Sequence, residues 1–153
     1  MQIGVIGAGK CSEETLKTAE EVGKLIAQGG AVLVCGGRGG VMAAAAKGAK
    51  AAGGTTVGIL PGGSASDANP FIDISIVTDM GHARNVIIVR SSNALIAIEG
   101  GYGTLSEIAI ARKIGIPVIG LNSWNLGTDI VVAEKPSHAV KEAFRAAQKQ
   151  NSG

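Results

Sequence analysis

Short runs of aliphatic and β-branched residues alternate along the chain with longer segments in which apolar residues recur at helical spacing. The runs occupy residues 3–6, 31–35, 56–60, 74–77, 94–98 and 118–121, and we predict a strand at each. Several of these runs are apolar at every position rather than at alternate positions. Strands of that kind are covered on both faces, which predicts a parallel sheet between two layers of helices.

The segments between the runs predict five helices. Leu16, Ala19, Val22, Gly23 and Ile26 form the inner stripe of the first helix, and the other four span 42–52, 82–92, 105–114 and 136–150. The expected fold is therefore a single Rossmann-like α/β domain, with a mostly parallel sheet and helices on both faces. We place this domain at residues 1–147 and expect the polar tail, 148–153, to fray.

The segment 82–92 contains four consecutive apolar residues, 86–89, which is more than one helix face can bury against a sheet. The helix predicted over 82–92 therefore needs a second covered face, apart from the one that packs on the sheet. We expect a homodimer or a higher homo-oligomer to cover it.

Composition excludes several classes of function. The net charge is only +2, the basic residues are dispersed, and 3% aromatic content leaves no platform for stacking bases, so we expect no nucleic-acid partner. No apolar stretch approaches the ~20 residues of a membrane span, and no leader is visible, which predicts a cytoplasmic protein without a membrane partner. Cys11 and Cys35 lack metal-ligand spacing, so we expect reduced thiols and no metal site.

Glycine clusters follow four of the predicted strands, at the edge of the sheet where ligands of open α/β folds bind. Loops without side chains beside helix N-termini expose backbone N–H groups, which favour an anion such as phosphate. The candidate ligand-binding residues in or beside these clusters are Gly7, Gly9, Lys10, Gly36, Gly37, Arg38, Gly39, Gly40, Gly100, Gly101, Tyr102, Gly103 and Thr104.

The first cluster matches two known phosphate motifs only in part. Residues 7–12 begin as G-x-G-x-x-G, but Ser12 stands in place of the third glycine and no acidic residue ends the second strand. Residues 4–10 fit G-x-x-x-x-G-K, but Cys11 replaces the Ser or Thr that would hold magnesium. Neither a dinucleotide fingerprint nor an NTPase loop is complete.

Thr104 and Glu107 have the spacing of a capping box, in which each side chain would bond the other's backbone N–H. Alternatively, Glu107 points into the glycine-lined cavity as an acid, a base or an electrostatic stabiliser. Arg84 and Arg38 are either exposed cations or ligand contacts, and Tyr102 is either a lid or a plain loop residue. The sequence leaves each of these pairs of alternatives open.

Residues 100–107, Gly-Gly-Tyr-Gly-Thr-Leu-Ser-Glu, resemble the P-G-G-x-G-T-x-x-E signature of the LONELY GUY (LOG) family. Residues 36–42 resemble the family's earlier glycine-rich loop, and residues 80–85 its M-H-x-R-K segment, with Arg84 standing 23 positions before Glu107. Glu99 takes the place of the signature proline, and Asn85 that of the lysine.

The resemblance implies hydrolysis of the N-glycosidic bond of a nucleoside 5′-monophosphate, which yields a free base and ribose 5-phosphate without any required cofactor. The loop 100–104 would hold the 5′-phosphate, Glu107 would stabilise the oxocarbenium-like ribose or activate water, and Arg84 would pair with Glu107 or with substrate. An arginine at that position would keep the carboxylate ionised.

Residues 46–62 also resemble the molybdenum-cofactor carrier proteins, a branch of the same fold. That resemblance implies a different function, in which the ligand is the molybdenum cofactor and is bound without being transformed. In both cases the expected partner is a small phosphate-bearing molecule.

Overall fold

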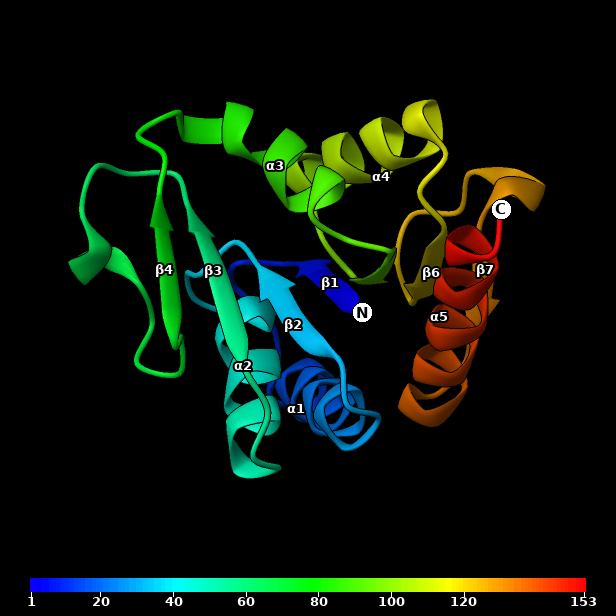
Figure 1. Ribbon diagram of the computed structural model, residues 1–153, viewed down its shortest axis with the longest axis horizontal. Coiled ribbons are helices and arrows are strands. Elements are labelled where there is room, and N and C mark those ends of the chain that lie inside the picture. Colours follow the sequence, from blue (N-terminus) through cyan, green and yellow to red (C-terminus); the bar gives the residue numbers. More distant parts are fainter.

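The computed structural model describes residues 1–153 as one seven-stranded parallel sheet between two layers of helices (Figure 1). The strands lie in the order β4-β3-β2-β1-β5-β6-β7. Their bounds are β1 Gln2–Gly7, β2 Val32–Cys35, β3 Thr56–Leu60, β4 Ile74–Val77, β5 Ala94–Ile98, β6 Val118–Leu121 and β7 Val131–Ala133. The predicted α/β class and parallel sheet are confirmed, and β7 is a strand that the apolar runs did not reveal.

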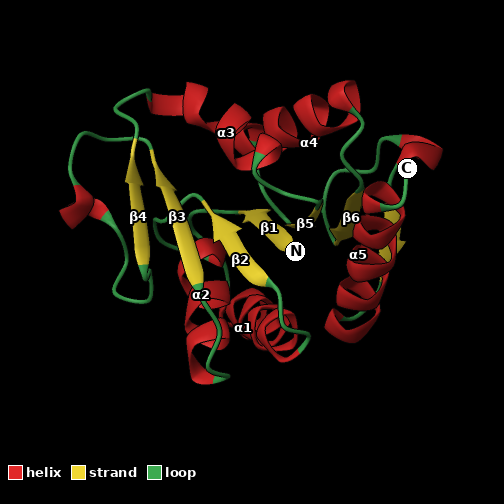
Figure 2. Ribbon diagram, in the orientation of Figure 1, coloured by secondary structure: helices red, strands yellow, loops and turns green.

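Helices cover the two faces unequally. Helices α1 (Glu13–Gln28), α2 (Val41–Ala51) and α5 (Pro136–Asn151) lie on one face, and α3 (Asn85–Arg90) and α4 (Tyr102–Ile114) lie on the other (Figure 2). The three-helix face encloses a core of 22 buried residues, against 11 on the α3–α4 face, so the second layer is the thinner one. Helix α5 extends into the polar C-terminal segment and ends at Asn151.

Small residues explain how α1 and α2 share one face. A Cβ added to Gly23 would overlap the carbonyl of Ala45, and one added to Gly48 would overlap the carbonyl of Glu20. The two helices therefore touch backbone to backbone, which accounts for part of the high glycine and alanine content. None of the helices combines the length and apolar character that crossing a bilayer requires.

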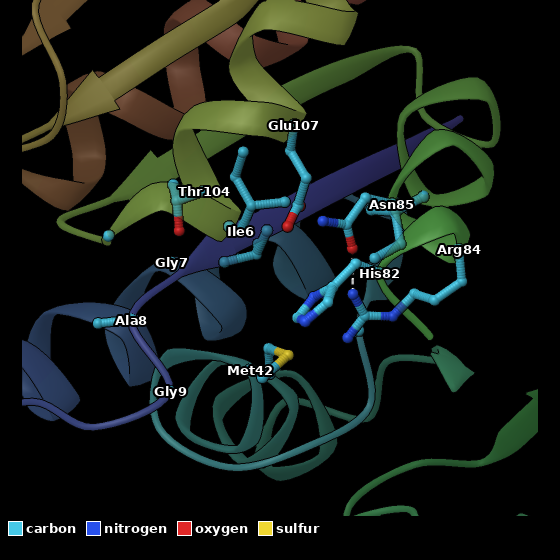
Figure 3. Close-up of a pocket in the computed structure, with 15 residues that line it drawn as sticks. Ile6, Gly7, Ala8, Gly9, Met42, His82, Arg84, Asn85, Thr104 and Glu107 are labelled. Atoms are coloured by element: carbon cyan, nitrogen blue, oxygen red, sulfur yellow. Dashed lines mark hydrogen bonds between the residues drawn. The ribbon is translucent and has the colours of Figure 1, made fainter. Parts of the chain in front are cut away.

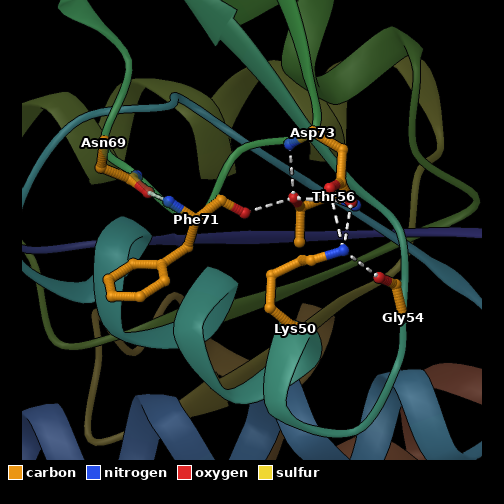
Figure 4. Close-up of polar contacts among 6 residues, drawn as sticks. All are labelled: Lys50, Gly54, Thr56, Asn69, Phe71 and Asp73. Carbon is orange, nitrogen blue, oxygen red and sulfur yellow. Dashed lines mark hydrogen bonds and ion pairs between the residues drawn. The ribbon is translucent and has the colours of Figure 1, made fainter.

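Polar contacts fasten the edge strand β4 to the rest of the sheet (Figure 4). Lys50, at the end of α2, forms an ion pair of 2.8 Å with Asp73, and Asp73 also accepts a 3.0 Å hydrogen bond from the Thr56 N–H. The hydrogen bond from Lys50 lowers the pKa of Asp73 most, and the hydrogen bond from the Thr56 N–H has the next largest effect in the same direction. These contacts hold the start of β4 beside β3.

The segment predicted as one helix over 82–92 consists of a 3₁₀ turn, η2 (Gly81–Arg84), followed by the short α3. Ile88 and Val89 of α3 are buried, whereas Val86 keeps 43% of its surface exposed. The apolar segment thus faces both the sheet and the outside.

Candidate functional site

A cavity of about 250 Å³ lies at the carboxyl edge of the sheet, beside the point where the strand order reverses between β1 and β5 (Figure 3). Loops after β1 and β2, the turn η2 and the first turns of α4 enclose it. Eight of the residues singled out from the sequence line this main cavity: Gly7, Gly9, Gly36, Arg84, Gly101, Gly103, Thr104 and Glu107.

The N-terminus of α4 opens onto this cavity. Gly101 caps the helix without any side-chain hydrogen bond, so the backbone N–H groups of the first turn have no partner within the helix. Gly100 adopts φ of +105°, and a Cβ at this position would overlap the buried Thr104 side chain. The glycines therefore let the loop turn tightly and aim N–H groups and the positive end of the helix dipole at the cavity.

The structure does not contain the capping box between Thr104 and Glu107. Helix α4 begins at Tyr102, so Thr104 lies inside the helix rather than at its N-cap. The Glu107 side chain is only 8% exposed, and its Oε2 has no hydrogen-bond partner in the protein. Figure 3 shows this carboxyl group directed into the main cavity.

Arg84 lies in the same cavity and is held by two hydrogen bonds. Its Nε donates to the Ile59 carbonyl at 2.9 Å, and its Nη1 donates to Asn85 Oδ1. The remaining nitrogen, Nη2, lies beside Gly36, where any side chain would crowd the guanidinium. The fold thus fixes a buried cation at the cavity wall.

Burial dominates the electrostatics of this pair. Desolvation raises the pKa of Glu107 to about 7, and the attraction of Arg84 opposes the shift without cancelling it. Desolvation also lowers the pKa of Arg84, against the opposing attraction of Glu107. The expectation that Arg84 would keep Glu107 fully ionised is therefore wrong, because the cost of burying the carboxylate outweighs the attraction. A carboxyl with this pKa exchanges its proton near neutral pH.

The other candidate residues lie outside the main cavity. Lys10 and Gly100 line a second, outer pocket that adjoins it, while Gly37, Arg38, Gly39, Gly40 and Tyr102 line neither. Gly40 caps α2 with φ of +63° and packs against the loop after β1, where the Val41 N–H donates to the Ala8 carbonyl at 2.9 Å. Arg38 is half-exposed and lies 3.9 Å from Asp67. Much of the second glycine cluster therefore shapes the loop.

Seven lining residues were not among the sequence candidates, and three of them carry nitrogen, oxygen or sulfur in the side chain: Met42, His82 and Asn85. Asn85 accepts from Arg84 and donates to Ser106 Oγ at 3.2 Å, and Ser106 Oγ donates to the Gly103 carbonyl at 2.7 Å. This chain of contacts ties the guanidinium to the first turn of α4. The sequence signal that could have identified Asn85 is its position directly after Arg84, in the segment that resembles M-H-x-R-K.

Cys35 is buried near this pair, and desolvation raises the pKa of its thiol to about 11. The thiol therefore stays protonated at neutral pH and has little nucleophilic character. Its sulfur accepts a 3.4 Å hydrogen bond from the Gly37 N–H. Cys35 thus acts as a packing residue beneath the glycine loop.

The fold and the site together define a Rossmann-like α/β protein with a glycine-lined cavity and a buried acid and cation at the sheet switch point. The chain belongs to the SLOG cluster4 family, whose model matches residues 1–151. The resemblance to the LOG-like branch of Rossmann proteins is thereby confirmed.

Two relatives illustrate the range of the similarity. An uncharacterized protein of Archaeoglobus fulgidus is 56% identical over 97% of this chain and 98% of its own length. The cytokinin riboside 5′-monophosphate phosphoribohydrolase of Mycobacterium tuberculosis is 38% identical over 72% of this chain and 64% of that enzyme.

Solved structures of molybdenum-cofactor proteins superpose closely on the chain. The molybdenum cofactor binding protein of Rippkaea orientalis gives a TM-score of 0.89 at 40% identity, with 94% of this chain and 95% of that chain covered. The molybdenum cofactor carrier protein of Chlamydomonas reinhardtii gives 0.88 at 40% identity, with 96% and 98% covered.

Proposed function

We propose that the chain is a nucleoside 5′-monophosphate phosphoribohydrolase, which uses water to cleave the N-glycosidic bond and releases the base and ribose 5-phosphate. The observation that carries the proposal is Glu107, a buried carboxyl whose Oε2 has no partner in the protein and whose pKa is about 7. This carboxyl lines the same cavity, of about 250 Å³, as the first turn of α4.

Each part of the cavity has a role in this reaction. The free N–H groups of residues 102–104 bind the 5′-phosphate, because a helix N-terminus favours an anion. Ionised Glu107 then stabilises the positive charge that develops on the ribose as the base departs, or takes a proton from the attacking water. Arg84 supplies a fixed positive charge that favours the ionised form of Glu107 and attracts the anionic substrate.

The similarity to the Mycobacterium tuberculosis phosphoribohydrolase supports the same reaction class. That similarity covers 64% of the enzyme, so the identity of the base remains part of the proposal. Hydrolysis of this kind requires no cofactor, since water is the only co-substrate.

The test is the release of ribose 5-phosphate from a panel of nucleoside 5′-monophosphates that includes AMP and cytokinin monophosphates. The wild type is compared with Glu107→Gln, which keeps the shape of the side chain but cannot ionise. Glu21→Gln, at an exposed position of α1, serves as the matched control. We expect release by the wild type and the control, and at least a hundredfold loss in Glu107→Gln with AMP binding retained. Absence of release by a folded wild type that binds AMP would contradict the hydrolase proposal.

A second function, carriage of the molybdenum cofactor, is favoured by the whole-chain similarity to the Rippkaea and Chlamydomonas proteins, which covers nearly all of both chains. In that case the main cavity holds the phosphate of the cofactor and leaves the ligand unchanged. A carrier would bind the cofactor tightly, would release no ribose 5-phosphate, and would keep its affinity in Glu107→Gln.

We propose in addition that two copies of the chain associate through the side of the molecule that carries β4 and α3. Exposed apolar side chains occur along β4, the segment after it and α3: Ile74, Ile76, Val77, Met80 and Val86. A homodimer that covers them would supply the second buried face implied by residues 86–89.

A further inference from the structure

An outer pocket of about 620 Å³ adjoins the main cavity on the far side of the loop after β1. It is lined by Ala8, Lys10, Glu99, Gly100, Gly101, Asn122, Ser123, Trp124 and Asn125. Ala8 and Gly101 line both spaces, so the phosphate-binding turn of α4 stands between them. A ligand bound at this turn can therefore extend in either direction.

Lys10 gives the outer pocket an unpaired cation. It is exposed and forms no salt bridge with any carboxylate of the chain. Glu99 also lines the pocket, but its Oε1 accepts a 2.6 Å hydrogen bond from Thr15 Oγ1 and is thereby held toward α1. Lys10 is thus available to an anionic group that lies beyond the first phosphate.

The chain's single tryptophan and single tyrosine stack on each other at the wall of this pocket. Trp124 lines the outer pocket, and Tyr102, which does not, stacks against it with ring centroids 6.1 Å apart. The Trp124 indole also donates a 3.0 Å hydrogen bond to the Gly101 carbonyl. These contacts fix an aromatic ring at the pocket wall, directly beside the phosphate-binding turn, where a flat heterocycle can stack on it.

The position of the two pockets matches the topology of the sheet. The strand order reverses between β1 and β5, and the main cavity and the outer pocket are joined across the loops that follow these two strands. In open α/β sheets this is the place where ligands with two halves joined by phosphates lie across the crevice.

We propose that the outer pocket binds the distal half of a diphosphate-bridged dinucleotide, whose proximal half occupies the main cavity. The first phosphate meets the N-terminus of α4, the second meets Lys10, and the distal heterocycle stacks on Trp124. This inference rests on the phosphate site of the proposed function, and extends it from a mononucleotide to a dinucleotide class of ligand.

The test compares AMP with diadenosine diphosphate, which is AMP extended by a second phosphate and a second adenosine. Affinities are measured by calorimetry on the full chain, and ligand recovery is checked by chromatography. We expect diadenosine diphosphate to bind at least about tenfold more tightly than AMP, since one stacked base contributes about that factor. The single tryptophan offers a direct readout, because its fluorescence should respond to the dinucleotide and not to AMP.

Three variants make the test specific. Trp124→Ala and Lys10→Ala should each remove most of the gain while leaving the AMP affinity within about twofold, and Trp124→Phe should keep most of it. Circular dichroism checks that each variant is folded. A gain that survives in Trp124→Ala would overturn the inference.

The remaining outcomes separate this inference from the proposed function. Equal affinity for both ligands would overturn the dinucleotide inference and leave the hydrolase proposal standing. Binding of diadenosine diphosphate without binding of AMP would support the inference and contradict a mononucleotide substrate. Failure of both ligands to bind would overturn both.

Discussion

Arg84 and Glu107 are buried residues that line the same cavity without forming a salt bridge. Each side chain is 8% exposed, yet the guanidinium bonds to the Ile59 carbonyl and to Asn85, and Glu107 Oε2 has no partner. The guanidinium of Arg84 is close enough to lower the pKa of the Glu107 carboxyl, but it forms no hydrogen bond with Glu107 Oε2. The fold thus keeps an acid partly charged and free to meet a ligand, an arrangement that suits catalysis more than stability.

The pH dependence of the proposed hydrolysis should report the titration of Glu107. If the ionised carboxylate stabilises the transition state, kcat/KM for AMP should rise with pH and level off above about 7, the pKa of the group in the folded chain. The measurement is the initial rate of ribose 5-phosphate release between about pH 5 and 9, with stability checked at each pH. A rate that falls as pH rises through this range would show instead that the protonated acid is the active form.

Removing the arginine charge should move that profile. In Arg84→Gln the attraction that lowers the pKa of Glu107 is lost while desolvation remains, so the half-maximal pH should shift upward. Arg38→Gln is the matched control, because Arg38 lies outside the cavity and is half-exposed. An unchanged midpoint in Arg84→Gln would mean that another group controls the profile.

The buried carboxyl should also destabilise the fold at high pH. Its pKa is about 7 in the folded chain against an ordinary value of 4.5, so the unfolded chain loses the proton first as pH rises. The free energy of unfolding of the wild type should therefore fall between about pH 4.5 and 7 and then level off. The Gln side chain of Glu107→Gln does not titrate in this range. Above about pH 8 the free energy of unfolding of this variant should therefore exceed that of the wild type by about 3 kcal/mol.

Urea denaturation of both proteins at low and high pH measures this difference. At about pH 4 the wild type and Glu107→Gln should have similar free energies of unfolding, because Glu107 is then largely protonated in both the folded and the unfolded chain. A difference between the two proteins that does not change with pH would mean that burial of Glu107 does not control its ionisation.

The strands could be predicted because most are short runs of continuous apolar residues. β5, for example, is apolar and buried throughout. β7 was missed because it has only three residues, with Val131 and Val132 exposed, so no buried run marks it. The predicted helix over 82–92 is shorter than expected because its first turn is a 3₁₀ turn that positions Arg84.

The site was only partly predictable, for reasons that depend on three-dimensional contacts. The spacing of Thr104 and Glu107 fits a capping box, and only the start of α4 at Tyr102 shows that no such box forms. Likewise, an arginine near a carboxylate suggests ionisation, whereas the balance depends on how far both groups are buried. Spacing along the chain carries no information about that burial.

Two glycines at the N-terminal turn of α4 should respond differently to the same substitution. A Cβ at Gly100 would overlap Thr104, and its φ of +105° disfavours any side chain, so Gly100→Ala should lower the free energy of unfolding by roughly 1–3 kcal/mol. A Cβ at Gly103 meets nothing within 4 Å, and the position is helical, so Gly103→Ala should leave stability unchanged or slightly raised. Urea denaturation of both variants compares them, and equal destabilisation would contradict the described loop geometry.

Two exposed valines provide a test of the proposed dimer. Val86 on α3 and Val131 on β7 are 43% and 45% exposed, but only Val86 lies in the apolar surface assigned to the interface. A charge buried there without a partner is costly, so Val86→Asp should shift the mass measured by light scattering from twice the chain mass of 15.2 kDa to that mass itself. Val131→Asp should remain dimeric. A monomeric wild type would contradict the proposed dimer, and dissociation by Val131→Asp alone would place the interface at the β7 edge.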